Sequence, residues 1–136
     1  MAPSLDCIDH IHVFVTDRAA SEAWYARVLG LSRMPSFESW ATDGGPLTLA
    51  DASGRIHLAL FERSAQPCRS TIALGVSSSQ FMAWREHLAI ILDSPPKVED
   101  HQLSWSLYFS DPDGNPYEIT TYEYTTVSKS LVARGA

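Results

Sequence analysis

IDHIHVFV at residues 8–15 and AASEAWYARVLGL at residues 19–31 place a strand-like stretch directly before a helix-like one. The same order returns in RSTIALGV at residues 69–76, which is followed by SQFMAWREHL at residues 79–88. Alternating apolar residues predict a strand and apolar residues at helical spacing predict a helix, so both halves of the chain predict the same local order. This internal repeat predicts two similar modules related by a pseudo-two-fold axis.

A second pair of segments extends the repeat toward the end of each module. LADASGRIHLALFE at residues 49–62 aligns with FSDPDGNPYEITTYE at residues 109–123. Two pairs of residues, each 61 positions apart, then become equivalent: His10 with Thr71, and His57 with Glu118. Equivalent strands face each other across a pseudo-axis, so we expect these four positions to converge on one cavity.

Turn residues, helix caps and apolar periodicity predict two βαβββ modules, at about 5–63 and 68–124, within one domain spanning 1–136. We expect an α+β fold in which the sheets, antiparallel or mixed, form a cup with the helices outside. The predicted elements of the first module are a strand at 8–15, a helix at about 18–29 with the apolar stripe Ala20, Trp24 and Val28, and strands near 33–41, 46–50 and 55–62. Those of the second are a strand at 69–76, a helix to about residue 91, and strands near 97–100, 103–110 and 116–124. The tail, 125–136, carries no clear pattern.

The composition narrows the classes of function. The net charge is −6, from 16 acidic and 10 basic residues, and the sequence has no basic patch, so nucleic acid is not an expected partner. No apolar run approaches the about 20 residues of a membrane-spanning helix, and the N-terminal MAPSLDCID lacks the apolar centre of a secretory leader. We therefore expect a cytoplasmic protein without a membrane partner, in which Cys7 and Cys68 are free thiols.

Residues that alternate along a strand share one of its faces. The expected inner lining is His10, His12, Phe14, His57, Ala59, Phe61, Thr71, Ala73, Gly75, Glu118, Thr120 and Tyr122. This lining mixes ionisable, aromatic and small side chains, which is typical of a pocket rather than of a filled core. Two imidazoles and a carboxylate suit a divalent metal with open coordination positions, so the candidate ligands are His10, His57 and Glu118. Zinc, nickel, manganese and iron are all chemically permitted.

Other polar side chains are candidates for proton transfer and substrate binding. Glu118 and His12 are the candidate proton-transfer groups, although His12 equally fits the rim of a pocket. Ser106 and Tyr108 alternate along one predicted strand, where they are either hydroxyl donors to a substrate oxygen or an outward polar row.

Two more residues have less specific surroundings in the sequence. Trp40 is either a pocket wall or a core residue. His101, in the polar stretch EDHQLS, is expected to be a solvated loop residue. The complete set of candidate substrate-binding residues is Thr71, Tyr108, Ser106, Trp40, Phe14 and Tyr122.

Three stretches, LDCIDHIHVFVTD, WYARVLGL and LYFSDPDGNPYEITTYE, together resemble the vicinal oxygen chelate superfamily. This superfamily includes glyoxalase I, fosfomycin- and bleomycin-resistance proteins and extradiol dioxygenases, and the resemblance extends from about residue 5 to 124. It implies a half-open, cup-shaped fold, often a homodimer, around one small-molecule pocket. It also implies that His10 and Glu118 are metal ligands.

The sequence departs from the family pattern at one ligand position. Thr71 stands where the family usually has a histidine, which puts dioxygenase and fosfomycin-type thiol transferase activities in doubt. His57 matches a fourth ligand position that glyoxalase-type sites use. Two hypotheses follow. One is a metal-dependent lyase or isomerase that acts on a small oxygen-chelating substrate, and the other is a metal-free protein that sequesters a planar or cationic compound.

Overall fold

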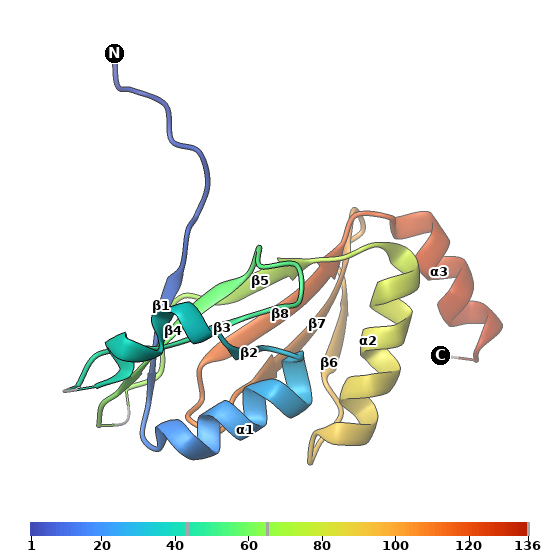
Figure 1. Cartoon of the computed structure of the whole chain (residues 1–136). Coiled ribbons are helices and arrows are strands. Elements are labelled where there is room, and N and C mark those ends of the chain that lie inside the picture. The colour runs from blue at the N-terminus through green and yellow to red at the C-terminus, as the bar shows by residue number, and fades with distance from the viewer. Residues whose placement is uncertain (43, 65, 136) are drawn as a thin grey trace. The chain divides into compact units, whose positions relative to one another are not determined.

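A computed structural model describes residues 1–42, 44–64 and 66–135, and the chain forms two compact units, Met1–Pro67 and Cys68–Ala136. Figure 1 shows that each unit has its own sheet with helices beside it. Each sheet has four strands and is mixed, because the first strand of the unit runs parallel to the last while the other neighbours are antiparallel. The predicted α+β class is confirmed.

The sheet of the first unit has the strand order β1-β4-β3-β2. Its elements are β1 Ile11–Val15, α1 Arg18–Leu29, β2 Ser32–Arg33, the 3-10 helix η1 Pro35–Ala41, β3 Leu47–Ala50 and β4 His57–Glu62. Strand pairing sets both His12 and Thr48 beside Ala59, so these three side chains share one face. The opposite face forms the core with residues that are at most 3% exposed: Val13, Val15, Leu47, Leu49, Leu58 and Leu60.

Helix α1 has the predicted bounds because both of its ends carry strong signals. The Asp17 carboxylate accepts a hydrogen bond from the Ala20 amide at 3.0 Å, and Gly30 ends the helix in the left-handed conformation with φ of 69°. The predicted apolar stripe is partly wrong, because Ala20 is exposed. The buried face instead consists of Ser21, Trp24, Tyr25, Val28 and Leu29.

The predicted strand near 33–41 is also wrong. The strand β2 contains only Ser32 and Arg33, and η1 follows it. Pro35 explains the change, because its fixed φ suits the start of a helical turn and it has no amide hydrogen for a strand ladder. As a consequence, the side chains of Phe37 and Trp40 come from a helical turn rather than from a strand.

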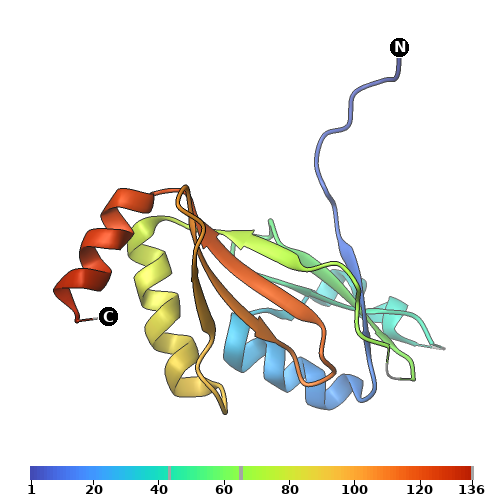
Figure 2. The same ribbon diagram turned by 180° about the vertical axis from the view of Figure 1, so that it is seen from behind.

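The second unit has the strand order β5-β8-β7-β6. Its elements are β5 Ile72–Gly75, α2 Ser78–Ile91, β6 Lys97–Asp100, β7 Trp105–Ser110, β8 Pro116–Thr121 and α3 Tyr124–Ala133. Helix α2 packs against β8, and α3 packs against α2, as Figure 2 shows from behind. The core of this unit includes Phe81, Leu88, Leu107, Tyr117 and Ile119, all at most 1% exposed.

Helix α3 was not expected from the sequence, and β8 ends before the predicted residue 124. Val127 and Leu131, four residues apart, are the buried positions of α3. The Trp105 indole donates a hydrogen bond to the Ser128 hydroxyl at 2.9 Å and stacks on Tyr124, which fastens the helix to β7. The spacing of the two apolar residues is a helical signal, but two residues alone define it weakly.

The hairpin turns of the two units differ in length by one residue. One turn is closed by the Asp51 amide donating to the Ile56 carbonyl, and the other by the Asp111 amide donating to the Asn115 carbonyl. The spacing between equivalent residues is therefore 60 at the start of the turn and 59 at its end. The extra residue lies in the turn of the first unit, so the number of residues between equivalent positions falls after the turn. The sequence alignment had assumed that this number rises to 61.

This register changes which residue of the first unit corresponds to Glu118. Glu118 pairs with Ala73 on β5, and Ala59 pairs with His12 on β1. His12 and Ala73 hold equivalent strand positions, 61 residues apart. Ala59 is therefore equivalent to Glu118, and the predicted equivalence of His57 with Glu118 is wrong.

Two further properties bear on the sequence expectations. Neither Cys7, which is exposed, nor Cys68, which is half-buried, forms a disulfide among the described residues. Across the described residues, no helix has the length and apolarity required to cross a membrane.

We expect Asn115→Ala to lower the free energy of unfolding by about 1–3 kcal/mol, since it removes buried hydrogen-bond partners. Asn115 is 0% exposed, and its side chain accepts from the Cys68 amide and donates to the Asp111 carboxylate, both at 2.8 Å. Urea denaturation measures the change, and Gln80→Ala, which truncates an exposed amide on α2, is the matched control. Equal destabilisation by the two variants would contradict this role of Asn115.

Candidate functional site

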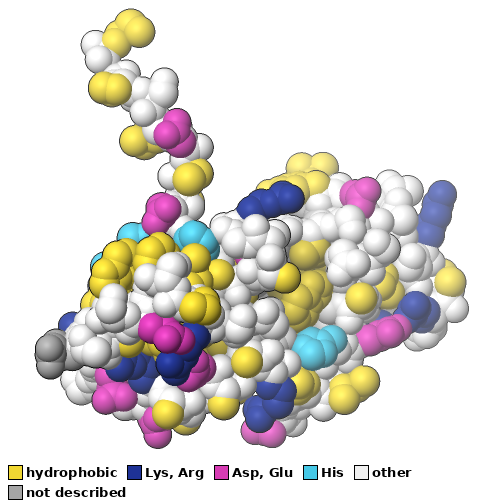
Figure 3. Space-filling model, viewed as in Figure 1, with side chains coloured by type: hydrophobic (Ala, Val, Ile, Leu, Met, Phe, Trp, Pro, Cys, Tyr) yellow, Lys and Arg dark blue, Asp and Glu magenta, His cyan; other side chains and the backbone are white. Residues whose placement is uncertain are grey.

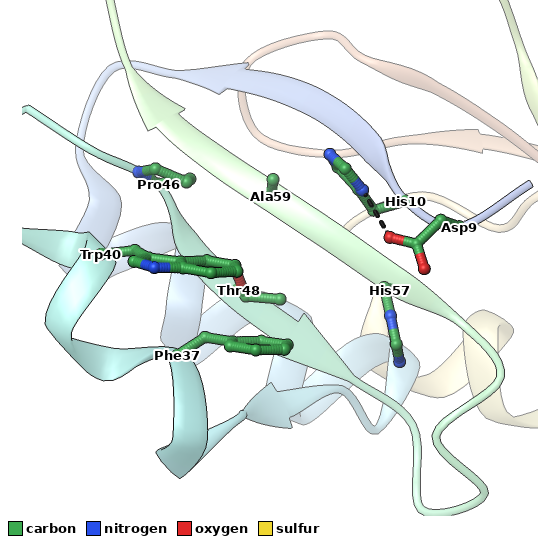
Figure 4. Close-up of a pocket in the computed structure, with 8 residues that line it drawn as sticks. All are labelled: Asp9, His10, Phe37, Trp40, Pro46, Thr48, His57 and Ala59. Atoms are coloured by element: carbon green, nitrogen blue, oxygen red, sulfur yellow. Dashed lines mark hydrogen bonds and ion pairs between the residues drawn. The ribbon is translucent and has the colours of Figure 1, made fainter.

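The first unit contains a pocket of about 140 Å³ between η1 and the polar face of the sheet. Its lining consists of Asp9, His10, Phe37, Trp40, Pro46, Thr48, His57 and Ala59 (Figure 4). In the space-filling view, histidine side chains lie beside a group of hydrophobic side chains at the base of the N-terminal segment (Figure 3). Both His10 and His57, predicted from sequence to share a cavity, line this pocket.

An aromatic wall forms one side of the pocket. The rings of Phe37 and Trp40 stack with centroids 4.3 Å apart and an interplanar angle of 3°. Trp40 remains 54% exposed, so the wall presents aromatic surface to solvent rather than to the core. The alternative that Trp40 is a core residue is therefore wrong.

Arg18 on α1 holds the segment that carries this wall. Its guanidinium donates to the carbonyl oxygens of Ala41 at 2.7 Å and Gly45 at 2.6 Å. Gly45 is also constrained, because a Cβ there would overlap the carbonyl oxygen of Trp40. The charge-assisted hydrogen bonds hold the backbone of Ala41, at the C-terminal end of η1, and that of Gly45. The close approach of Gly45 to Trp40 further restricts the backbone there.

The two histidines at the start of β1 form a linked pair. His10 hydrogen-bonds the Asp9 carboxylate through Nδ1 at 2.7 Å, and its Nε2 lies 3.2 Å from Nε2 of His12. Their rings stack at 5.1 Å, and the His12 ring packs against Phe61 at 4.7 Å. Phe14 meets Phe61 edge-on at 6.3 Å, so aromatic rings support the pair on the same face.

His57 has a different orientation from His10. It begins β4 and is half-buried. In the view of Figure 4 its imidazole extends in the direction opposite to that of His10. The two histidines thus share a pocket without their rings pointing toward one another.

In the second unit, hydroxyl groups surround the Glu118 carboxylate. Ser106, which is 0% exposed, donates to a Glu118 oxygen at 3.1 Å and lies 3.1 Å from the Thr120 hydroxyl. Tyr108 lies directly opposite Glu118 in the β7–β8 pair and hydrogen-bonds it. Burial, followed by the hydrogen bond to Glu118, raises the pKa of the Tyr108 phenol, which therefore stays protonated at neutral pH.

His101 extends this cluster. It follows β6 and is exposed, as expected for a loop residue, but its Nε2 lies 3.0 Å from the Tyr108 hydroxyl. The sequence indicated that Ser106 and Tyr108 are either hydroxyl donors or an outward polar row. Strand register places Tyr108 opposite Glu118 and Ser106 opposite Thr120, so both hydroxyls share a face with Glu118, and their role toward a substrate oxygen stays a prediction.

Two other predicted site residues lie outside the strands. Thr71 is exposed and precedes β5. Tyr122 is 81% exposed and follows the end of β8, so strand alternation does not place it on the face of Glu118. Asp9 and Phe37 were missed: Asp9 neighbours His10 in sequence, and Phe37 precedes Trp40 by one helical turn.

Each unit by itself carries a side chain whose chemistry suits a divalent ion, an imidazole in the first and a carboxylate in the second. Asp9 holds Nδ1 of His10, an outer arrangement that orients imidazoles toward metals, and Ser106 orients the Glu118 carboxylate. Within the described parts of each unit, no three side chains from His, Cys, Asp and Glu form a ready-made metal cluster.

Comparison with known proteins gives a family match. Residues 7–119 match the family model described as the glyoxalase/bleomycin resistance protein/dioxygenase superfamily. No curated protein matches the chain in sequence.

Solved structures support the same fold. An integron cassette protein from the mobile metagenome of the Halifax Harbour sewage outfall has a TM-score of 0.70 and 19% identity, covering 86% of this chain and 99% of its own. A Bacillus anthracis protein provisionally assigned to the glyoxalase family has a TM-score of 0.69 and 21% identity, covering 90% and 100%. The fosfomycin resistance protein FosX from Listeria monocytogenes, complexed with Mn(II) and sulfate, has a TM-score of 0.66 and 14% identity, covering 94% and 99%.

Arg18→Ala should loosen the aromatic wall without unfolding the unit. Losing one or two hydrogen bonds of about 1 kcal/mol each predicts roughly tenfold faster amide exchange in residues 34–42. Hydrogen–deuterium exchange followed by mass spectrometry measures this rate. Arg27→Ala, on the exposed side of α1, is the control and should leave the rate unchanged. An unchanged rate in Arg18→Ala would show that the wall is held by other contacts.

Proposed function

The chain belongs to the glyoxalase/bleomycin resistance protein/dioxygenase superfamily, and from this premise we propose that it is a metal-dependent lyase or isomerase of the glyoxalase-like kind. The substrate class is a small molecule that chelates a divalent ion through adjacent oxygens. Zinc, nickel, manganese and iron are all chemically permitted at such a site. The observation that carries the proposal is the orientation of His10 by Asp9 in an aromatic-walled pocket.

In this proposal His10 and Glu118 hold the ion, together with an imidazole of the first unit. His57 is the candidate from the sequence, and it lines the same pocket as His10. FosX is a superfamily member whose structure contains Mn(II), which supports a divalent ion in this chain. The bound ion would supply Lewis-acid stabilisation of the negative charge that develops on a substrate oxygen.

The remaining chemistry belongs to the side chains around the ligands. Glu118 accepts a substrate proton and returns it, with His12 as the second candidate for this transfer. The Ser106 hydroxyl donates a hydrogen bond to one Glu118 oxygen and so holds the carboxylate in place. The protonated Tyr108 is a hydrogen-bond donor on the same face, and Phe37 and Trp40 exclude water from the apolar part of a ligand.

Substituting Ser106 tests how the carboxylate is positioned. We expect Ser106→Ala to weaken Zn²⁺ and Mn²⁺ binding roughly tenfold, because losing the partner that orients a ligand typically weakens metal affinity ~10–100-fold. Isothermal titration of protein purified without chelators or metal-affinity tags measures the affinity. Ser110→Ala, at the exposed end of the same strand, is the control and should bind as wild type.

Glu118→Gln tests the ligand itself and should weaken binding of both ions more than Ser106→Ala does, because an amide oxygen is a neutral, poorer ligand. If wild-type protein binds neither Zn²⁺, Mn²⁺, Ni²⁺ nor Fe²⁺, the enzyme proposal is wrong.

A metal-free binding function is the second candidate, and the exposed Phe37–Trp40 stack favours it. A parallel pair of rings with one face open to solvent is suited to stacking on a planar ligand, and the net charge of −6 favours a cationic one. Under this function Trp40→Ala should abolish binding of a planar cationic dye such as an acridine, whereas Trp40→Phe should retain part of it. Fluorescence titration measures both affinities. Dye binding that is indifferent to Trp40 would exclude the stack as the binding surface.

We also propose that the protein is cytoplasmic and that it is a homodimer, the second of which the family resemblance implies. Sedimentation velocity at micromolar concentration tests the oligomeric state directly.

A further inference from the structure

The first unit lacks a ligand side chain at the position equivalent to Glu118. Strand register assigns Ala59 to that position, because Ala59 pairs with His12 as Glu118 pairs with Ala73. Alanine offers no donor atom, and Thr71 offers only a neutral hydroxyl at the position equivalent to His10. A second nitrogen ligand for the proposed ion must therefore come from another residue of this face.

His12 lies directly beside Ala59 on the neighbouring strand. The side chain of Ala59 is a single methyl group, and the His12 ring packs against Phe61 on the same strand as Ala59. Its Nε2 is 3.2 Å from Nε2 of His10, so the two imidazole nitrogens lie close together at the start of β1. Both residues are exposed, so an ion can reach them without a change of fold.

The spacing of the two nitrogens matches a chelate. Two nitrogens bound about 2.0–2.1 Å from one ion lie about 2.8–3.4 Å apart in octahedral or tetrahedral arrangements. The observed separation of 3.2 Å falls inside this range. Because Asp9 engages Nδ1 of His10, the Nε2 of a neutral His10 carries the lone pair that faces His12.

We infer that His12, and not His57, is the second imidazole ligand, so that the segment His10-Ile11-His12 at the start of β1 chelates the divalent ion. This inference rests on the proposed function for the identity of the site and adds a ligand that the repeat does not supply. His57 is the rival. It shares the pocket, but it corresponds to Pro116 rather than to Glu118, and in Figure 4 its ring extends away from His10.

Two probes test the inference on the full-length protein. Calorimetric titration with Zn²⁺ gives affinities, and pulsed EPR of bound Cu²⁺, which prefers nitrogen ligands, counts the coordinated imidazoles. We expect His12→Ala and His12→Asn to weaken Zn²⁺ binding at least roughly tenfold, since even an outer-shell change costs ~10–100-fold. The imidazole count should fall from two to one in both variants.

Two histidine variants serve as comparisons. His57→Ala removes the rival ligand, and His87→Ala removes a half-buried histidine on α2 in the other unit. Both should keep the wild-type affinity and imidazole count, with circular dichroism confirming that every variant is folded. Wild-type behaviour of both His12 variants, or loss of an imidazole in His57→Ala, would overturn the inference.

Glu118→Gln separates this inference from the proposed function. If the His12 variants bind as wild type while Glu118→Gln binds weakly, the inference is wrong and the proposed function stands. If the His12 variants bind weakly while Glu118→Gln binds as wild type, the chelate exists but the proposed site is wrong. Absence of Zn²⁺ and Cu²⁺ binding in wild type would overturn both.

Discussion

The hydrogen bonds inside two hairpin turns set the strand register on which each face of the protein depends. Asp51 and Asp111 use their carboxylates to hold the amides of Ile56 and Asn115, both at 2.9 Å. Once a turn has a fixed length, every pair beyond it is fixed, and a slip of one residue would exchange the polar and apolar faces of the strand. Tyr108 therefore lies opposite Glu118 because of the turn from Asp111 to Asn115, of which neither residue is part.

The units use this common framework to present different chemistry. The polar face of the first sheet carries imidazoles and aromatic rings. The polar face of the second carries a carboxylate surrounded by hydroxyl donors from Ser106 and Tyr108. Duplication thus preserved the backbone and the apolar core, while the side chains on the other face diverged.

Helix caps and turn residues made most helices and strands predictable from the sequence. The candidate site was only partly predictable, because it depends on strand register across the whole sheet. The bounds of α1 were predicted because Asp17 and Gly30 mark its ends through backbone chemistry alone. The strand expected near 33–41 was wrong because Pro35 favours the start of a helical turn, and η1 follows there. His10 and Glu118 were singled out by the internal repeat and by a family resemblance, and their role as metal ligands stays a prediction. The relation of His57 to Glu118 was misjudged because one of the two turns is a residue longer than the other. The sequence alone did not show that the longer turn belongs to the first unit.

The attachment of η1 has a consequence for how this protein could change over evolutionary time. Arg18 donates hydrogen bonds to the carbonyl oxygens of Ala41 and Gly45, groups that every amino acid possesses, and neither bond involves the side chain of Phe37 or Trp40. The backbone scaffold of the wall is thereby separated from the identity of its surface. Phe37 and Trp40 can be exchanged for residues of other shapes while the loop keeps its path. Variants of this chain could acquire new ligand preferences through single substitutions, with Arg18 and Gly45 as the positions that must stay constant.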